Sequence, residues 1–241
     1  MIKQALRFLL SLKTTIALLC ALLFLLLAGA FIMPAREEFR KIHETPMLIW
    51  LKTQPFEVSW WLWGALIVLS LLTANTLLCS VESIVKKRNG TQWLLLISPQ
   101  IIHAGFLFIL LAHLLSSLGG YKSYVGVQEG MFLNIDETTT LQVKDIHIAL
   151  TPDGYISDWA VDVAYVAGGK VLRHDSLLPN KPSLFEGIGV YAKDFRVYPE
   201  KAVLLEISRE PGAVWALIGG ILFMAGTITL LALRMKRDSV Q

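Results

Sequence analysis

The stretch Leu94–Ser117, LLLISPQIIHAGFLFILLAHLLSS, decides the fold class of this chain. It contains no Asp, Glu, Lys or Arg, and it is long enough to cross a bilayer, which takes about 20 apolar residues. Its two ionisable side chains are His103 and His113. An ionisable group is costly to place at membrane depth, so each histidine is a hypothesis about function.

Three further stretches are long and apolar enough to span a bilayer. They are Thr14–Met33, Val58–Val81 and Ala213–Leu233. All 22 Lys and Arg and all 19 Asp and Glu lie outside the four stretches, and 54% of the chain is hydrophobic. The first stretch is longer than the roughly 7–15 apolar residues of a signal peptide, so we expect a retained helix.

We therefore predict a polytopic α-helical membrane protein with four transmembrane helices and one small exported antiparallel β domain between helices three and four. A membrane domain, 1–117, would hold the helices 14–33, 58–81 and 94–117. Residues 118–212 would form the exported, β-rich domain. Residues 213–241 would hold the helix 213–233 and a cytoplasmic tail.

Basic residues mark one side of the predicted membrane domain. Residues 1–13, 81–93 and 234–241 contain three Lys or Arg each, whereas 118–212 contains 13 acidic and nine basic residues. The positive-inside rule then places both termini in the cytoplasm and 118–212 in the periplasm or outside the cell. We expect a bacterial inner (cytoplasmic) membrane protein in contact with membrane lipid. Nothing in the charge pattern indicates nucleic acid.

The segment 118–212 has the pattern of an antiparallel β domain. Trp159, Val161, Val163 and Tyr165 alternate with smaller or polar residues, and Gly168-Gly169 follows as a turn. Leu141–Leu150 and Lys201–Ser208 are further predicted strands. The two cysteines, Cys20 and Cys79, lie in or at the end of apolar stretches, so no disulfide is expected in this domain. No Cys-x-x-Cys-His motif for covalent heme is present either.

The two intramembrane histidines admit several functions. Imidazole at that depth suggests an axial ligand to heme, a proton relay, or a hydrogen-bonded helix contact. Ten residues separate His103 from His113, about 15 Å along a helix and about 80° around it, so they cannot ligate one iron together. Apolar side chains follow His103 on its face, and Gly105 would permit close approach of a flat ring or a backbone.

Three local patterns carry structural predictions. Pro99 predicts that the third helix begins near Ser98, which would cap it. Gly212, Ala216 and Gly220 predict close helix packing along the fourth helix. A cluster of tryptophans indicates an aromatic belt at the membrane interface, or else a platform that faces heme or a partner: Trp50, Trp60, Trp61 and Trp63.

Several stretches together resemble the ResB (also called CcsB) family of cytochrome c biogenesis membrane proteins of the System II type, in a short form. The resemblance rests on the order and spacing of these stretches along nearly the whole chain, since a single stretch is not specific to the family. They are Leu12-Lys13-Thr14-Thr15, Ser59-Trp60-Trp61, Asn75, Cys79-Ser80, His103-Ala104-Gly105, Gly119-Gly120, Gly126-Val127-Gln128-Glu129-Gly130, and Asn180-Lys181-Pro182-Ser183-Leu184 with Gly189 and Tyr191.

The resemblance implies a subunit of a cytochrome c synthase that helps to move or hold heme b across the membrane. Such a subunit works with a CcsA-type partner, which carries a tryptophan-rich WWD segment, and the two attach heme to apocytochrome c on the outer side. It would be at most an accessory part of the heme lyase. The family's histidine of the third helix, an axial heme ligand, corresponds to His103, and His113 is a weaker alternative.

Two departures from the family pattern limit this interpretation. Trp61 is followed by Leu62, so the chain has no WWD segment and is not the CcsA half. Ser183 is inserted in the Asn-x-Pro-Leu stretch, and the exported domain is short for the family. The alternative function is a non-enzymatic membrane anchor or sensor whose exported β domain binds a protein or a ligand.

Overall fold

The computed structural model describes residues 11–86, 93–136 and 138–238. The described residues form two compact units. One unit holds all the α-helices, and the other holds His43–Pro46 and Gly119–Pro211.

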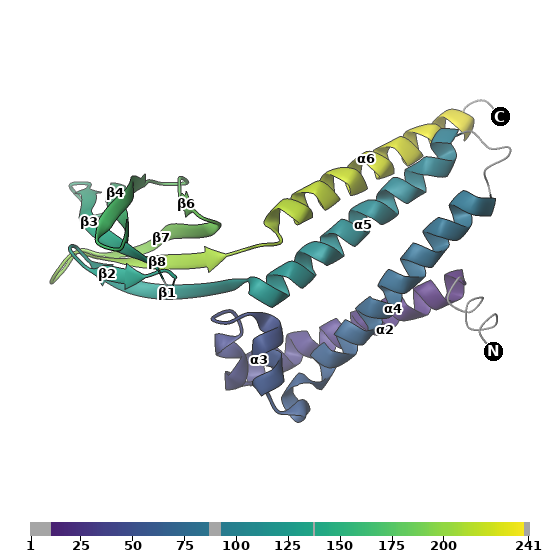
Figure 1. Cartoon of the computed structure of the whole chain (residues 1–241), viewed down its shortest axis with the longest axis horizontal. Helices are drawn as coiled ribbons and strands as arrows, with labels where there is room; N and C mark the ends of the chain where they lie inside the picture. Colours follow the sequence, from purple (N-terminus) through teal and green to yellow (C-terminus); the bar gives the residue numbers. More distant parts are fainter. Residues whose placement is uncertain (1–10, 87–92, 137, 239–241) are drawn as a thin grey trace. The chain divides into compact units, whose positions relative to one another are not determined.

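Four of the helices are long and apolar enough to cross a membrane, which confirms the predicted number. They are α2 (Leu12–Ile32), α4 (Phe56–Lys86), α5 (Trp93–Gly119) and α6 (Ala213–Asp238). Between α2 and α4 lie two short 3-10 helices, η1 (Met33–Ala35) and η2 (Glu37–Lys41), and the short helix α3 (Met47–Thr53). The helices run in pairs, α2 beside α4 and α5 beside α6 (Figure 1).

The predicted start of the third helix at Ser98 or Pro99 is wrong, because α5 already begins at Trp93 and Pro99 lies inside it. Proline has no N–H to give to the carbonyl one turn earlier, but transmembrane helices tolerate this loss when neighbouring groups compensate. Ser98 does not cap the helix. Its buried hydroxyl donates a 2.6 Å hydrogen bond to the carbonyl of Leu94 within the same helix.

Helices α5 and α6 are in backbone contact along a line of glycines. A Cβ atom added to Gly105 would lie 2.5 Å from the backbone nitrogen of Phe223, and one added to Gly219 would lie 2.7 Å from the carbonyl oxygen of Gly105. A Cβ atom added to Gly226 would lie 2.9 Å from the backbone nitrogen of Ile102. Only glycine leaves room for an approach this close.

The contact uses a different spacing from the predicted one. Gly212, Gly219 and Gly226 face α5, whereas Ala216 is exposed and a Cβ added to Gly220 would meet nothing within 4 Å. Seven residues are close to two turns of a helix, so this spacing keeps one face on the neighbouring helix over several turns. The prediction of close packing is therefore confirmed, and the four-residue spacing is wrong.

The second unit is a sandwich of two four-stranded antiparallel sheets, as the predicted antiparallel β domain requires. One sheet has the order β1-β8-β7-β6 and the other has the order β2-β3-β4-β5. The strands are β1 (Tyr121–Gln128), β2 (Phe132–Asn134), β3 (Thr139–Leu150), β4 (Ile156–Ala167), β5 (Lys170–Leu177), β6 (Ser183–Phe185), β7 (Ile188–Arg196) and β8 (Ala202–Arg209).

The core of the sandwich consists of the inward residues of both sheets. Leu141, Val161, Val190 and Leu205 are fully buried there. Every second residue of a strand points inward, so the alternation predicted from Val161, Val163 and Tyr165 matches their burial in β4. The predicted Gly-Gly turn joins β4 to β5, and both glycines have positive φ, 55° and 77°, as a two-residue hairpin turn requires.

Candidate functional site

His103 lies in α5, inside the helical unit, and contacts α4. Its Nδ1 atom is 2.8 Å from the hydroxyl oxygen of Ser80, and the ring is half-buried. Ten residues after Trp93 correspond to about 15 Å along α5, so the ring lies within the apolar length of the helix. Among the described residues, the hydrogen bond found for the His103 ring is the one between Nδ1 and Ser80.

Gly105, two residues further along, lies on the opposite face of α5. Two helical residues turn the chain by about 200°. The backbone of Phe223 in α6 occupies the space beside Gly105, so of the two predicted uses of this glycine the structure has backbone packing. A planar ligand of His103 would therefore have to approach from the other side of α5.

The structure does not bring His113 together with His103. The His113 side chain is exposed, and its carbonyl accepts a 2.6 Å hydrogen bond from Ser117. Among the described residues, no group of three or more His, Cys, Asp or Glu side chains could hold a metal ion.

Two pairs of residues from the family-like stretches meet between helices. Thr15 in α2 donates a 3.0 Å hydrogen bond to the amide oxygen of Asn75, which is buried in α4. Ser80 and His103 form the second pair, between α4 and α5. Sequence reasoning singled out both stretches but did not pair Ser80 with His103. The sequence feature that could have suggested this pair is a serine in one apolar stretch and a histidine in the next.

The tryptophans of the predicted aromatic belt divide into two groups. Trp50 and Trp61 are buried and pack against Phe39, with ring centroids 5.0 and 6.1 Å from it. Trp60 and Trp63 remain exposed, as an interfacial belt requires. The buried pair belongs to a small core formed with residues of η2, α3 and the start of α4.

In the β domain, the stretch Gly126–Gly130 ties β1 to its neighbours. Gly130 has φ 81°, and its N–H donates to the carbonyl of Val143 in β3. The carboxylate of Glu129 accepts a 3.1 Å hydrogen bond from the backbone N–H of Ile146. These contacts give the stretch a structural role in connecting the two sheets.

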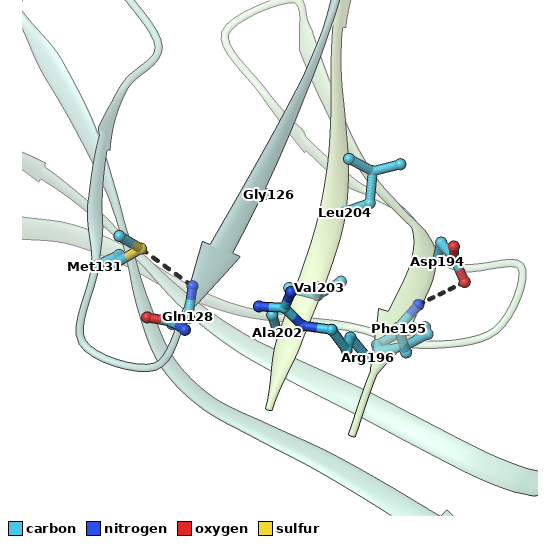
Figure 2. A pocket seen from close by; sticks show the side chains of 9 residues that line it. All are labelled: Gly126, Gln128, Met131, Asp194, Phe195, Arg196, Ala202, Val203 and Leu204. Carbon is cyan, nitrogen blue, oxygen red and sulfur yellow. Dashed lines mark hydrogen bonds between the residues drawn. The ribbon is translucent and has the colours of Figure 1, made fainter. Parts of the chain in front are cut away.

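Gly126 also leaves a hollow of about 440 Å³ on the outer face of the β1-β8-β7 sheet (Figure 2). A Cβ atom added to Gly126 would meet nothing within 4 Å, so the missing side chain opens the surface there. Figure 2 shows Arg196 reaching across β8 beside this hollow. The hollow is lined by Gly126, Gln128, Met131, Asp194, Phe195, Arg196, Ala202, Val203 and Leu204.

A buried carboxylate lies on the same sheet face. Glu206 in β8 is 5% exposed, and its oxygens are 3.3 Å from Lys122 Nζ and 3.2 Å from Lys193 Nζ. Burial raises the pKa of Glu206, but hydrogen bonds from Lys193, Tyr124 and Lys122 outweigh it and hold the pKa below its ordinary value. The carboxylate therefore stays ionised and cross-links three strands.

The inserted Ser183 has a partner on each side. Its hydroxyl lies 2.7 Å from the hydroxyl of the fully buried Tyr165 and donates a 2.7 Å hydrogen bond to Asp175. Burial raises the pKa of Asp175, yet the bonds from Ser183 and Ser176 and the charge of Arg173 leave the pKa lowered. The insertion thus completes a polar network that links β6 to β4 and β5.

Residues 97–202 match the model of the ResB-like family. The matched part contains His103, the Gly126–Gly130 stretch and the strands β1–β7, whereas α2 and α4 precede it. The N-terminal stretches of the resemblance, Ser80 among them, therefore lie outside the match.

Curated relatives agree with this match. A cytochrome c biogenesis protein CcsB of Synechococcus sp. is 24% identical over 110 residues, 41% of this chain and 23% of that protein. A cytochrome c biogenesis protein Ccs1 of Rhodomonas salina is 31% identical over 114 residues, 42% of this chain and 26% of that protein. The chain thus spans about a quarter of the length of these relatives.

Among solved structures, the cytochrome c heme lyase CcmF is similar at 15% identity. Its TM-score is 0.43, with 92% of this chain and 35% of that one covered, which does not establish a shared fold. The family match and the relatives together confirm the family that the sequence stretches indicated. Over residues 97–202 the chain is similar to the ResB-like family, and its curated relatives include the CcsB and Ccs1 cytochrome c biogenesis proteins.

Proposed function

We propose that this chain is a subunit of a System II cytochrome c synthase. It holds or carries heme b within the membrane and presents it for covalent attachment to apocytochrome c on the outer side. Its partner is a CcsA-type membrane protein with a WWD segment. Heme is the cargo of this system, and the chain is an accessory subunit of the heme lyase.

The observation that carries the proposal is the position of His103. An imidazole lies in an apolar helix, and the hydrogen bond found for it among the described residues engages Nδ1, which leaves Nε2 for a further ligand. A nitrogen lone pair in hydrocarbon is costly unless it is used, and coordination to iron uses it. His103 is therefore proposed as one axial ligand, with His113 as the weaker alternative.

The proposed orientation follows from the basic residues at the helix ends. Both termini lie in the cytoplasm of a bacterium, α4 ends and α5 begins at the inner face of its cytoplasmic membrane, and residues 118–212 lie in the periplasm. His103 is then nearer to the cytoplasmic end of α5 than to its outer end, because it precedes the middle of Trp93–Gly119. This position suits the uptake of heme from the inner side.

The second candidate function is a membrane anchor or sensor that binds a protein or ligand through its β domain. The hollow beside Gly126 is the observation that favours it. The relatives named as cytochrome c biogenesis proteins favour the synthase. The two functions differ in one measurable property, which is heme bound to the purified protein.

The test is an optical spectrum of the full chain, purified in detergent after co-expression with a CcsA-type partner. The wild type should show a Soret band and reduced α and β bands. His103→Ala should lose or shift these bands, and added imidazole should restore them. His113→Ala, on the same helix, tests the weaker alternative ligand. Unchanged heme in His103→Ala would remove His103 from the site, and a wild type without heme would favour the anchor or sensor.

A further inference from the structure

The contact between Ser80 and His103 has a direct chemical consequence for ligand binding. In neutral imidazole one ring nitrogen carries a proton and the other carries a lone pair. Iron binding at Nε2 requires the lone pair at that atom, so the proton must be on Nδ1. The Nδ1–H then needs an acceptor, and the hydroxyl oxygen of Ser80 lies 2.8 Å away.

A serine hydroxyl suits this position in both states of the histidine. When no ligand is bound, the Ser80 O–H can donate to a bare Nδ1, and Nε2 carries the proton. When iron binds, the same oxygen accepts the Nδ1–H, since a hydroxyl is both donor and acceptor. His103 can therefore change its tautomer without moving, and α4 holds the ring in the same orientation throughout.

We propose that Ser80 is a positioning residue for His103, which selects Nε2 as the iron ligand and sets the basicity of the imidazole through the Nδ1–H···Oγ hydrogen bond. This inference rests on the proposed function, since it needs heme at His103. A hydrogen bond from Nδ1–H increases electron donation by the ring and favours ferric iron. Its loss should raise the midpoint potential of the heme.

The experiment compares three substitutions in α4 of the full chain, purified with its CcsA-type partner, by redox titration of the heme spectrum. Ser80→Ala should raise the midpoint potential and speed the displacement of the axial ligand by added imidazole. Ser80→Thr, which keeps the hydroxyl, should restore the wild-type values. Ser70→Ala is the matched control, because the hydrogen bond found for the Ser70 hydroxyl among the described residues goes to the carbonyl of Leu66 in its own helix.

The outcomes separate this inference from the proposed function. His103→Ala, measured in parallel, reports on the ligand itself. Loss of heme bands in His103→Ala with wild-type potential and exchange in Ser80→Ala would overturn the positioning role alone. Unchanged heme in His103→Ala, or no heme in the wild type, would overturn both. If Ser70→Ala shifted the midpoint potential as much as Ser80→Ala did, the positioning role would also be overturned, because such a shared shift would reflect altered packing of α4.

Discussion

The line of glycines between α5 and α6 leads to a sharp prediction about stability. Gly219 and Gly220 are neighbours on α6, yet only Gly219 faces α5. A Cβ atom at Gly219 would lie 2.7 Å from the carbonyl oxygen of Gly105 and 2.9 Å from two atoms of Ile109. A Cβ atom at Gly220 would meet nothing within 4 Å. The two substitutions to alanine therefore have the same chemistry and opposite surroundings.

The magnitude follows from these distances. Ordinary contact begins at 3.4 Å, so the helices must separate by about 0.7 Å at Gly219 to admit the methyl group. A gap of 0.5–1 Å forfeits roughly a quarter to a half of the dispersion attraction of each contact along the seam. We expect Gly219→Ala to lower the free energy of unfolding by about 1–3 kcal/mol, the usual effect of overpacking. Gly220→Ala should change it by less, at most about 1 kcal/mol towards greater stability.

The assay is reversible unfolding of the full chain in mixed micelles, with a mild detergent titrated by sodium dodecyl sulfate and helicity followed by circular dichroism. The difference between the two variants is the measured quantity, so errors of extrapolation largely cancel. Equal free energies for Gly219→Ala and Gly220→Ala would refute the close contact between α5 and α6.

Two further predictions concern the β domain of the full chain. The pKa of Glu206 is depressed in the folded state, so the stability that its charge contributes is present above the unfolded pKa near 4.3 and is lost as the pH falls through the folded pKa. The unfolding temperature in detergent should therefore fall in this acid range. Glu206→Gln should have a lower unfolding temperature at pH 7, and this temperature should depend less on pH. A wild-type slope in Glu206→Gln would contradict this. Tyr165→Phe and Ser183→Ala should each lower the free energy of unfolding by about 1–3 kcal/mol, because each leaves a hydrogen-bonding group of the network unpaired. The double variant should cost less than the two together, and strict additivity would show that the two hydroxyls do not interact.

Local patterns in the sequence predicted the elements well. A continuous apolar stretch long enough for a bilayer has few alternatives to a helix, and all four were found. The alternation before Gly168-Gly169 predicted the β4–β5 hairpin, because the period of two and the turn residues act within one short segment. Both signals need no knowledge of the rest of the chain.

Features that depend on a neighbouring helix were predicted less well. The sequence allowed several faces of α6 to pack closely, and only the position of α5 decides that Gly219 is used and Gly220 is not. Pro99 predicted a helix start, because a proline inside a helix is stable only when tertiary contacts or side chains compensate for the lost backbone hydrogen bond. In both cases the deciding energy comes from another segment of the chain.

The candidate site shows the same division. His103 could be found from composition, since an ionisable residue in an apolar stretch stands out. Its partner Ser80 could not, because the two residues are 23 positions apart and meet only when α4 and α5 are side by side. Ser80 stood out only as part of the family-like stretch Cys79-Ser80, and nothing in the sequence paired it with His103.

The faces of α5 connect the packing to the chemistry. Gly105 must face α6, because any side chain there would collide with the backbone of Phe223. That requirement fixes the rotation of α5 about its axis. With Gly105 turned towards α6, the ring of His103 lies about 200° away and is directed towards α4, where Ser80 meets its Nδ1. Gly105, two residues after the histidine, thus acts through geometry, because it selects which neighbouring helix the histidine contacts.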